Sequence, residues 1–329
     1  MFAPRSPLLG SLIVALAASL FGLLGPLSRT VYALGMTPAG FVAWRAGVGA
    51  LAVALLVAWR LRRSGARLVG WRSLDARGRL SIGLAGLMGA ALNLAMFQAF
   101  SRSPIAVVLL CFYTYPAIVA AASAMLGWER LDRARVAALG ISLAGMVAVV
   151  AGAPGGVNAG VDPLGVVLAL SAALSQATFV LVSRHGYRSV PTDQSMLVIL
   201  GAAAVVAVAV GLSGGAGASM LLPLARPDLL TVVVFTGIFA AAIPSLLFLA
   251  GIRWIGPVRA GILMLVEPLV GVALAAMLLR EPLGPIQVAG GLAILAGAIV
   301  VQRARPSVPL IAPAGEPSRE PSAEGVGRA

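Results

Sequence analysis

The chain contains an internal repeat. The segment that begins at Pro116 and contains Glu129 and Leu131 returns from Pro268 with every spacing preserved, at an offset of 152 residues. Over residues 116–150 this offset gives 13 identities in 35 positions without a gap. A repeat of this length constrains the fold more than any other feature, because the two halves must build similar units.

The composition identifies lipid as the solvent of these units. Hydrophobic residues make up 60% of the chain and charged residues only 11%, whereas a soluble domain carries about a quarter charged residues. Apolar runs of about 20 residues can cross a bilayer. The sequence predicts an all-α integral membrane protein with ten transmembrane helices, at residues 8–27, 38–59, 80–100, 105–126, 134–151, 163–183, 194–213, 229–251, 258–279 and 285–302.

Arginine sets the expected orientation. All 24 basic residues are Arg, and cytoplasmic segments of membrane proteins carry an excess of them. If the N-terminus is cytoplasmic, 17 Arg lie in cytoplasmic segments and 4 in the opposite loops. We therefore expect both termini in the cytoplasm. The net charge of +13 then reports orientation, and we expect no nucleic acid partner.

The two halves are expected to be inverted relative to each other. Each copy has five spans, and an odd number places the second copy the opposite way up. Such inverted repeats are typical of secondary transporters, whose substrate site lies near the midplane between the repeats; a duplicated structural bundle is the alternative. The expected parts are a cytoplasmic N-terminus at 1–7, a first repeat at 8–151, an external linker at 152–162, a second repeat at 163–303 and a disordered cytoplasmic tail at 304–329.

The repeated motif carries a family resemblance. A mid-helix proline is followed 13 residues later by Glu129 or Glu281 at a helix end, and then by a helix with Leu-Ala-Gly, as in Leu143-Ala144-Gly145. With ten spans in two halves, the chain resembles the EamA-type members of the drug/metabolite transporter superfamily over about residues 8–303. The resemblance implies a carrier of amino acids, related metabolites, sugars or drugs that works by alternating access.

Two ionisable residues fall inside predicted spans. An ionisable group there costs about 2.5 to 3.5 kcal/mol on insertion scales and is a functional candidate by default. Glu267 directly precedes Pro268 and suits a proton carrier or a ligand for a substrate ammonium; a structural Glu is the alternative. Arg45, which follows Trp44, either extends to the membrane surface or faces a cavity, where it would bind a substrate carboxylate or pair with Glu267.

Further polar residues are candidates for the same cavity. Tyr115 is the repeat counterpart of Glu267, and Pro116 and Pro268 are the expected helix breaks. In a continuous helix Tyr113 and Tyr115 point about 200° apart, so we expect one to line the cavity and the other to pack. The remaining candidates are Trp44, Asn93, Gln98, Ser171, Ser175 and Gln176.

The sequence indicates neither enzyme nor metalloprotein. Cys111 is the only cysteine and His185 the only histidine, so we expect no metal site and no cofactor. The absence of Lys excludes a Walker motif and ATP-driven pumping by this chain. We expect a multi-pass protein of the cell membrane, inner or plasma, that exports a small molecule, with membrane lipids as partners and a homodimer left open. A non-transporting scaffold or sensor and a lipid-carrier translocase are the alternatives.

Overall fold

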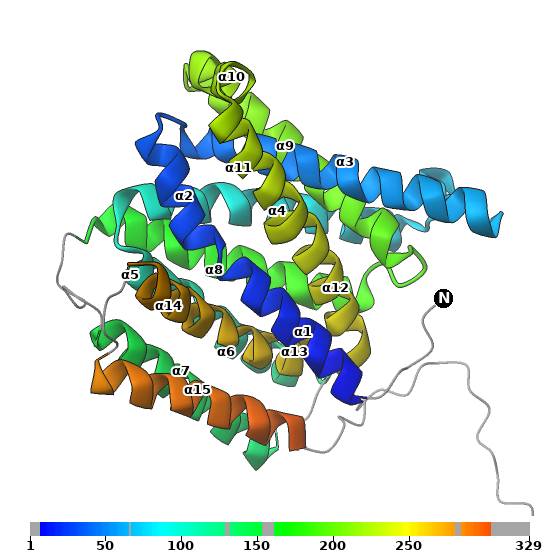
Figure 1. The fold of residues 1–329 in the computed structure, drawn as a ribbon. Helices are drawn as coiled ribbons and strands as arrows, with labels where there is room; N and C mark the ends of the chain where they lie inside the picture. Colours follow the sequence, from blue (N-terminus) through cyan, green and yellow to red (C-terminus); the bar gives the residue numbers. More distant parts are fainter. Residues whose placement is uncertain (1–6, 66, 129–131, 153–160, 280–283, 304–329) are drawn as a thin grey trace, which may run out of the picture.

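The computed structural model describes residues 7–65, 67–128, 132–152, 161–279 and 284–303, and every regular element in them is a helix (Figure 1). The predictions for the cytoplasmic N-terminus, the external linker, the C-terminal tail and the two repeat carboxylates fall outside the described residues. The positions concerned are 1–6, 153–160, 304–329, Glu129 and Glu281.

The helices follow the predicted spans in order. Those of the first half are α1 (Pro7–Phe21), α2 (Leu24–Ala33), α3 (Pro38–Ser64), the short η1 (Trp71–Ser73), α4 (Ala76–Arg102), α5 (Ile105–Phe112), α6 (Tyr115–Met125) and α7 (Arg133–Ala151). Those of the second half are α8 (Pro163–His185), α9 (Thr192–Ser213), α10 (Gly217–Ala225), α11 (Pro227–Gly237), the π-helical η3 (Ile238–Ala242), α12 (Ile243–Ile255), α13 (Pro257–Met264), α14 (Val266–Leu279) and α15 (Pro285–Arg303). The sequence did not predict η1 and α10.

Polar caps place the starts of several long helices. Thr37, Asp75, Asp132 and Asp162 each accept a hydrogen bond from a backbone N–H of the first helical turn, at 2.8 to 3.2 Å. Each such cap contributes about 1 kcal/mol. The caps lie at the ends of apolar runs, so they fix where the chain turns between successive helices.

Eight helical segments of the described chain are long and apolar enough to cross a membrane. They have 19 to 29 residues and a mean hydropathy of 1.8 to 2.6. The pair α13–α14 and the helix α15 take the places of the ninth and tenth predicted spans.

Two of the interruptions are repeat-related. The fourth span divides at Tyr113 and Thr114, and the ninth divides at Leu265. Tyr113 and Leu265 are 152 residues apart, which is the offset of the sequence repeat. Pro116 and Pro268 have no N–H for the carbonyls four residues earlier, and this explains why both helices break there.

Two further interruptions were not predicted. The first span divides into α1 and α2 at Gly22 and Leu23, and the eighth contains η3 between α11 and α12. These breaks have no equivalent in α8 and α4, which are the repeat counterparts and run without interruption. The internal symmetry is therefore incomplete at the centre of the molecule.

The packing also follows the repeat. Helices α7 and α15 lie side by side at one edge of the bundle and α3 and α9 at the other, with the pairs α4–α8 and α1–α12 between them (Figure 1). In the repeat, α4 and α8 correspond to α12 and α1, so these two pairs are equivalent to each other. In the other two pairs, α3 corresponds to its own partner α9, and α7 to its own partner α15. The interface between the halves is therefore built from equivalent helices.

The α7–α15 contact depends on glycine, and this gives a test of the packing. A Cβ on Gly145 would lie 2.6 Å from the carbonyl oxygen of Gly290. We expect Gly145→Leu to lower the stability by about 1 to 3 kcal/mol through overpacking, seen as a lower unfolding midpoint in detergent. Gly140→Leu is the control on the same helix, because a Cβ there meets nothing within 4 Å. Equal midpoints for the two variants would contradict the packing.

Candidate functional site

A central cavity of about 110 Å³ lies where the interrupted helices meet. Its lining comes from both halves of the chain. The polar and charged lining residues are Arg45, Asn93, Tyr115, Gln176, Ser245 and Glu267. The aromatic and thioether ones are Phe21, Phe97, Phe100, Phe112, Phe179, Phe248, Met96, Met196 and Met264, and the large aliphatic ones are Leu24, Leu92, Ile199 and Leu200. The cavity thus combines two ionisable groups with mostly aromatic and thioether walls.

Arg45 on α3 points into the bundle and is only 4% exposed. One guanidinium nitrogen donates to the Ala240 carbonyl at 3.0 Å, and another donates to Oδ1 of Asn93. Its Cζ lies 4.8 Å from the centre of the Phe97 ring, which adds a cation–π contact. These contacts fix the side chain at the cavity wall, away from the membrane surface.

The carbonyl that Arg45 binds lies four residues before a third proline of the spans. Pro244 has no N–H to donate to the carbonyl four residues earlier, which is that of Ala240. Ala240 lies in the π-helical η3, and such segments occur often at functional sites. Arg45 therefore donates to a backbone carbonyl for which Pro244 cannot provide the α-helical hydrogen bond. Pro244 lies within a predicted apolar span, and this position was the signal that could have indicated the break.

Glu267 lies in the first turn of α14 and is 9% exposed. Its carboxyl group is next to the Tyr113 hydroxyl, although the two do not reach standard hydrogen-bond geometry. Among the described residues, the ion pairs are Arg60–Asp193, Arg102–Asp162 and Arg226–Asp228. Arg45 and Glu267 thus line one cavity without forming an ion pair with each other.

The break in the fourth span lies between the two tyrosine side chains. Tyr115 lines the cavity, and Tyr113 is fully buried outside its lining. Their ring centres are nevertheless only 5.9 Å apart. The expected separation of about 200° assumed a continuous helix, whereas this span is interrupted at Tyr113 and Thr114. Gln176 on α8 lies next to Tyr115, and its Oε1 is buried without a hydrogen bond.

Three sequence candidates lie elsewhere. Gln98 is not among the residues that line the cavity, although α4 provides Asn93 and Phe97. Trp44 faces a different, apolar groove, and its indole N–H donates to the Met220 carbonyl at 2.7 Å. Ser171 is exposed on α8 and donates to the Val167 carbonyl within its own helix. Each of these side chains leaves its helix on a face that points away from the cavity.

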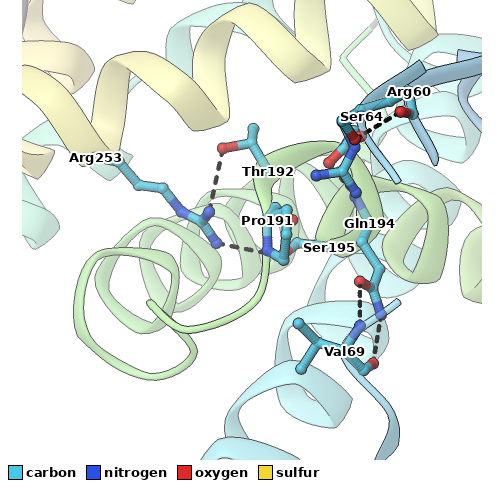
Figure 2. Close-up of polar contacts among 9 residues, drawn as sticks. Arg60, Ser64, Val69, Pro191, Thr192, Gln194, Ser195 and Arg253 are labelled. Carbon is cyan, nitrogen blue, oxygen red and sulfur yellow. Dashed lines mark hydrogen bonds and ion pairs between the residues drawn. The ribbon is translucent and has the colours of Figure 1, made fainter. Parts of the chain in front are cut away.

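A group of polar contacts lies at one end of the bundle, between the end of α12 and the start of α9 (Figure 2). Arg253, at the end of α12, donates to the Val190 carbonyl, the Thr192 hydroxyl and the Ser195 hydroxyl at 2.9 to 3.2 Å. We call these four residues the Arg253 cluster. Met196 of the cavity wall directly follows Ser195 on α9, so the cluster adjoins the lining of the central cavity.

The same turn of α9 is also bound to the first half of the chain. Asp193 forms a 2.7 Å ion pair with Arg60 of α3. The side chain of Gln194 pairs with both backbone groups of Val69, at 3.0 and 2.6 Å (Figure 2). The start of α9 therefore joins α12 to α3 across the two repeats.

The opposite end has its own polar contacts. Arg29 donates to the Ser103 carbonyl at 2.8 Å, and the Tyr32 hydroxyl donates to the Phe97 carbonyl at 3.1 Å. Arg102 contacts Asp162 at 3.1 Å, and this hydrogen bond holds the pKa of the Asp162 carboxyl below its usual range. Polar contacts thus join the helices at both ends of the bundle.

Within the described residues, no group of three or more His, Cys, Asp or Glu side chains is arranged to hold a metal ion. The groups available to a ligand in the cavity are therefore Arg45, Glu267, neutral polar side chains and apolar walls.

Comparisons with known proteins add a family and a fold. The model of the EamA-like transporter family matches residues 8–151 and 163–303. A solved structure described only as "Crystal structure of protein" is similar, with a TM-score of 0.69 and 22% identity over 88% of this chain and 95% of that one. No curated protein matches.

Access to the cavity can be tested with single cysteines in a Cys111→Ala background. We expect a polar, membrane-impermeant thiol reagent to modify Gln176→Cys, because Gln176 lines the cavity. Ser171→Cys is the control on the same helix, since Ser171 is exposed on the outer face and would lie in lipid. Modification of Ser171→Cys but not of Gln176→Cys would contradict the assignment of the two faces.

The role of the Arg253 cluster can be tested with the same reagent. Arg253→Gln removes charged hydrogen-bond donors, each of which contributes about 1.5 to 3 kcal/mol. We expect the modification rate of Met196→Cys to rise by about tenfold, the factor that 1.4 kcal/mol produces. Arg188→Gln is the control for charge, because Arg188 is exposed in the adjacent loop. Equal rates in the two variants would show that the cluster does not restrict access.

Proposed function

Because the chain belongs to the EamA-like transporter family, we propose that it is a secondary transporter that moves a small metabolite across the cell membrane by alternating access. The proposed topology has ten spans in two inverted halves, with both termini in the cytoplasm. Eight apolar helices of the described chain and the places of α13–α14 and α15 support this topology, as does the Arg distribution.

The observation that carries the proposal is the central cavity, which holds a guanidinium and a carboxyl group among apolar walls. A scaffold or sensor has no need for such a cavity. The chemistry fits a small solute with a carboxylate, an amino group and an apolar body, such as an amino acid or a related compound. The substrate carboxylate would bind Arg45, the ammonium would bind Glu267, and the phenylalanine rings would contact the body.

Arg45 is suited to bind a carboxylate with little reorganisation. Its contacts with Ala240, Asn93 and Phe97 already hold the guanidinium in place. An arriving carboxylate would therefore pay little side-chain entropy, which is the advantage of a preorganised site. The Asn93 oxygen would give up its hydrogen bond from Arg45 to the carboxylate. The Asn93 side chain would still be held by its amide nitrogen, which donates to the Gly89 carbonyl at 2.7 Å.

Glu267 is the proposed coupling residue. A carboxyl at membrane depth is costly when charged, so it favours either a bound proton or a bound cation. A substrate ammonium and a proton would then compete for one group, and this competition would couple transport to the proton gradient without ATP. We take export as the working direction, which liposomes loaded on either side test directly.

The two ends would open in turn around this site. The Arg253 cluster, the Arg60–Asp193 ion pair and the Gln194–Val69 pairing hold one end. The Arg29–Ser103 and Arg102–Asp162 contacts hold the other. These hydrogen bonds and ion pairs can exchange for contacts with water, so each end can separate without exposing the apolar core.

The coupling role is tested with purified protein in liposomes, with a panel of amino acids and an imposed proton gradient. We expect Glu267→Gln to lower the pH-driven uptake rate by more than about tenfold, equivalent to 1.4 kcal/mol or more, and to remove its pH dependence. Asp228→Asn makes the same chemical change at an exposed carboxyl and should retain both. An unchanged rate and pH profile in Glu267→Gln would refute the coupling role.

A further inference from the structure

A second cavity of about 190 Å³ lies on the other side of Glu267. We call it the side chamber. It shares Phe21, Phe100 and Glu267 with the central cavity, and residues such as Ile105 of α5 and Met146 of α7 form its remaining walls. The two cavities are therefore neighbours, with Glu267 in the wall of both.

The side chamber differs from the central cavity in its chemistry. Among the described residues that line it, Glu267 is the only one with a polar side chain. Arg45, Asn93 and Gln176 line the central cavity alone. The side chamber thus offers a ligand one ionisable residue, Glu267, among walls of apolar residues.

Tight glycine contacts give the chamber its shape. A Cβ on Gly22 would lie 2.9 Å from the carbonyl oxygen of Glu267, and one on Gly25 would lie 3.0 Å from Cγ2 of Ile105. Gly22 lies in the break between α1 and α2, and Gly25 lies in the first turn of α2. The break lets the chain turn close to α14 and leaves space beside it, so the chamber is a consequence of the interrupted first span.

The size of the chamber sets the size of its ligand. An apolar cavity of about 150 Å³ in another protein binds benzene, so the side chamber has room for a group of that size. A carboxylate in apolar surroundings is stabilised by a paired and hydrogen-bonded cation, whereas an unpaired one is strongly penalised. An apolar body with a primary ammonium group satisfies both conditions.

We infer that the side chamber is a second binding site, specific for small apolar primary amines, in which the ammonium group binds Glu267 and a ring-sized apolar group fills the space between α2, α5 and α7. Such an amine lacks the carboxylate that Arg45 would recognise. It would occupy Glu267 from the opposite side and so exclude the ligand of the central cavity. The inference concerns binding and does not depend on the proposed transport function.

Benzylamine is the probe, and benzyl alcohol is its uncharged match. Calorimetry on the full chain in lipid nanodiscs, corrected with empty nanodiscs, should show benzylamine binding at least about tenfold tighter than benzyl alcohol, as expected for a charged hydrogen bond. Glu267→Gln should abolish that difference. Equal affinity for the two probes in the unmodified chain would overturn the inference.

Filling variants identify the cavity that is occupied. Ala106 lines only the side chamber, and Ala203 lines only the central cavity. We expect Ala106→Phe to weaken benzylamine binding by at least about tenfold, while Ala203→Phe retains it. Ala121→Phe, at an exposed position, is the control for the added ring. Loss of binding in Ala203→Phe with retention in Ala106→Phe would place the amine in the central cavity and overturn the inference. If Ala106→Phe fails to fold, the smaller change Ala106→Leu takes its place in the same comparison.

Discussion

The hydrogen bond from the Arg45 guanidinium to the Ala240 carbonyl joins the charged wall of the central cavity to the π-helical interruption of the eighth span. In lipid, an unsatisfied backbone carbonyl and an unpaired cation each cost several kcal/mol. Pro244 cannot donate the α-helical hydrogen bond to this carbonyl, and the Arg45 guanidinium donates to it at 3.0 Å. The hydrogen bond lowers the cost of burying both the carbonyl and the cation, and it holds a positive charge at the cavity wall.

The other interruptions follow the same constraint. Non-helical backbone at membrane depth is tolerated where it is buried in protein or lines a cavity. The breaks at Gly22, Tyr113 and Leu265 all adjoin residues that line the central cavity, and the last two are equivalent in the repeat. Within the membrane, these helix breaks and the polar residues that line the cavity therefore lie close together, where protein and not lipid surrounds them. The apolar side chamber beside Glu267 arises from the same geometry.

The sequence predicted the order of the helices well and the site only partly. Periodic apolar runs and the repeat located the spans, and Pro116 and Pro268 indicated two breaks, because these signals are local. The π-helical segment and the break at Gly22 were missed, since their equivalents in the other half are uninterrupted. Arg45, Asn93, Tyr115, Gln176 and Glu267 line the cavity, whereas Gln98 and Trp44 do not. The difference depends on which helix face meets a neighbour, and composition within a span does not specify it.

The central claim of the proposed mechanism is that the two ends of the bundle open in turn around one cavity. The most direct measurement is pulsed electron spin resonance on a cysteine-free chain in liposomes, with one label pair at each end. Trp59 and Ser189 report on the end closed by the Arg253 cluster, and Thr30 and Ser213 report on the other; all four are exposed. Across a change of pH, or on addition of a transported amino acid, alternating access requires one distance to lengthen while the other shortens. Distances that stay fixed, or that lengthen together, would contradict it.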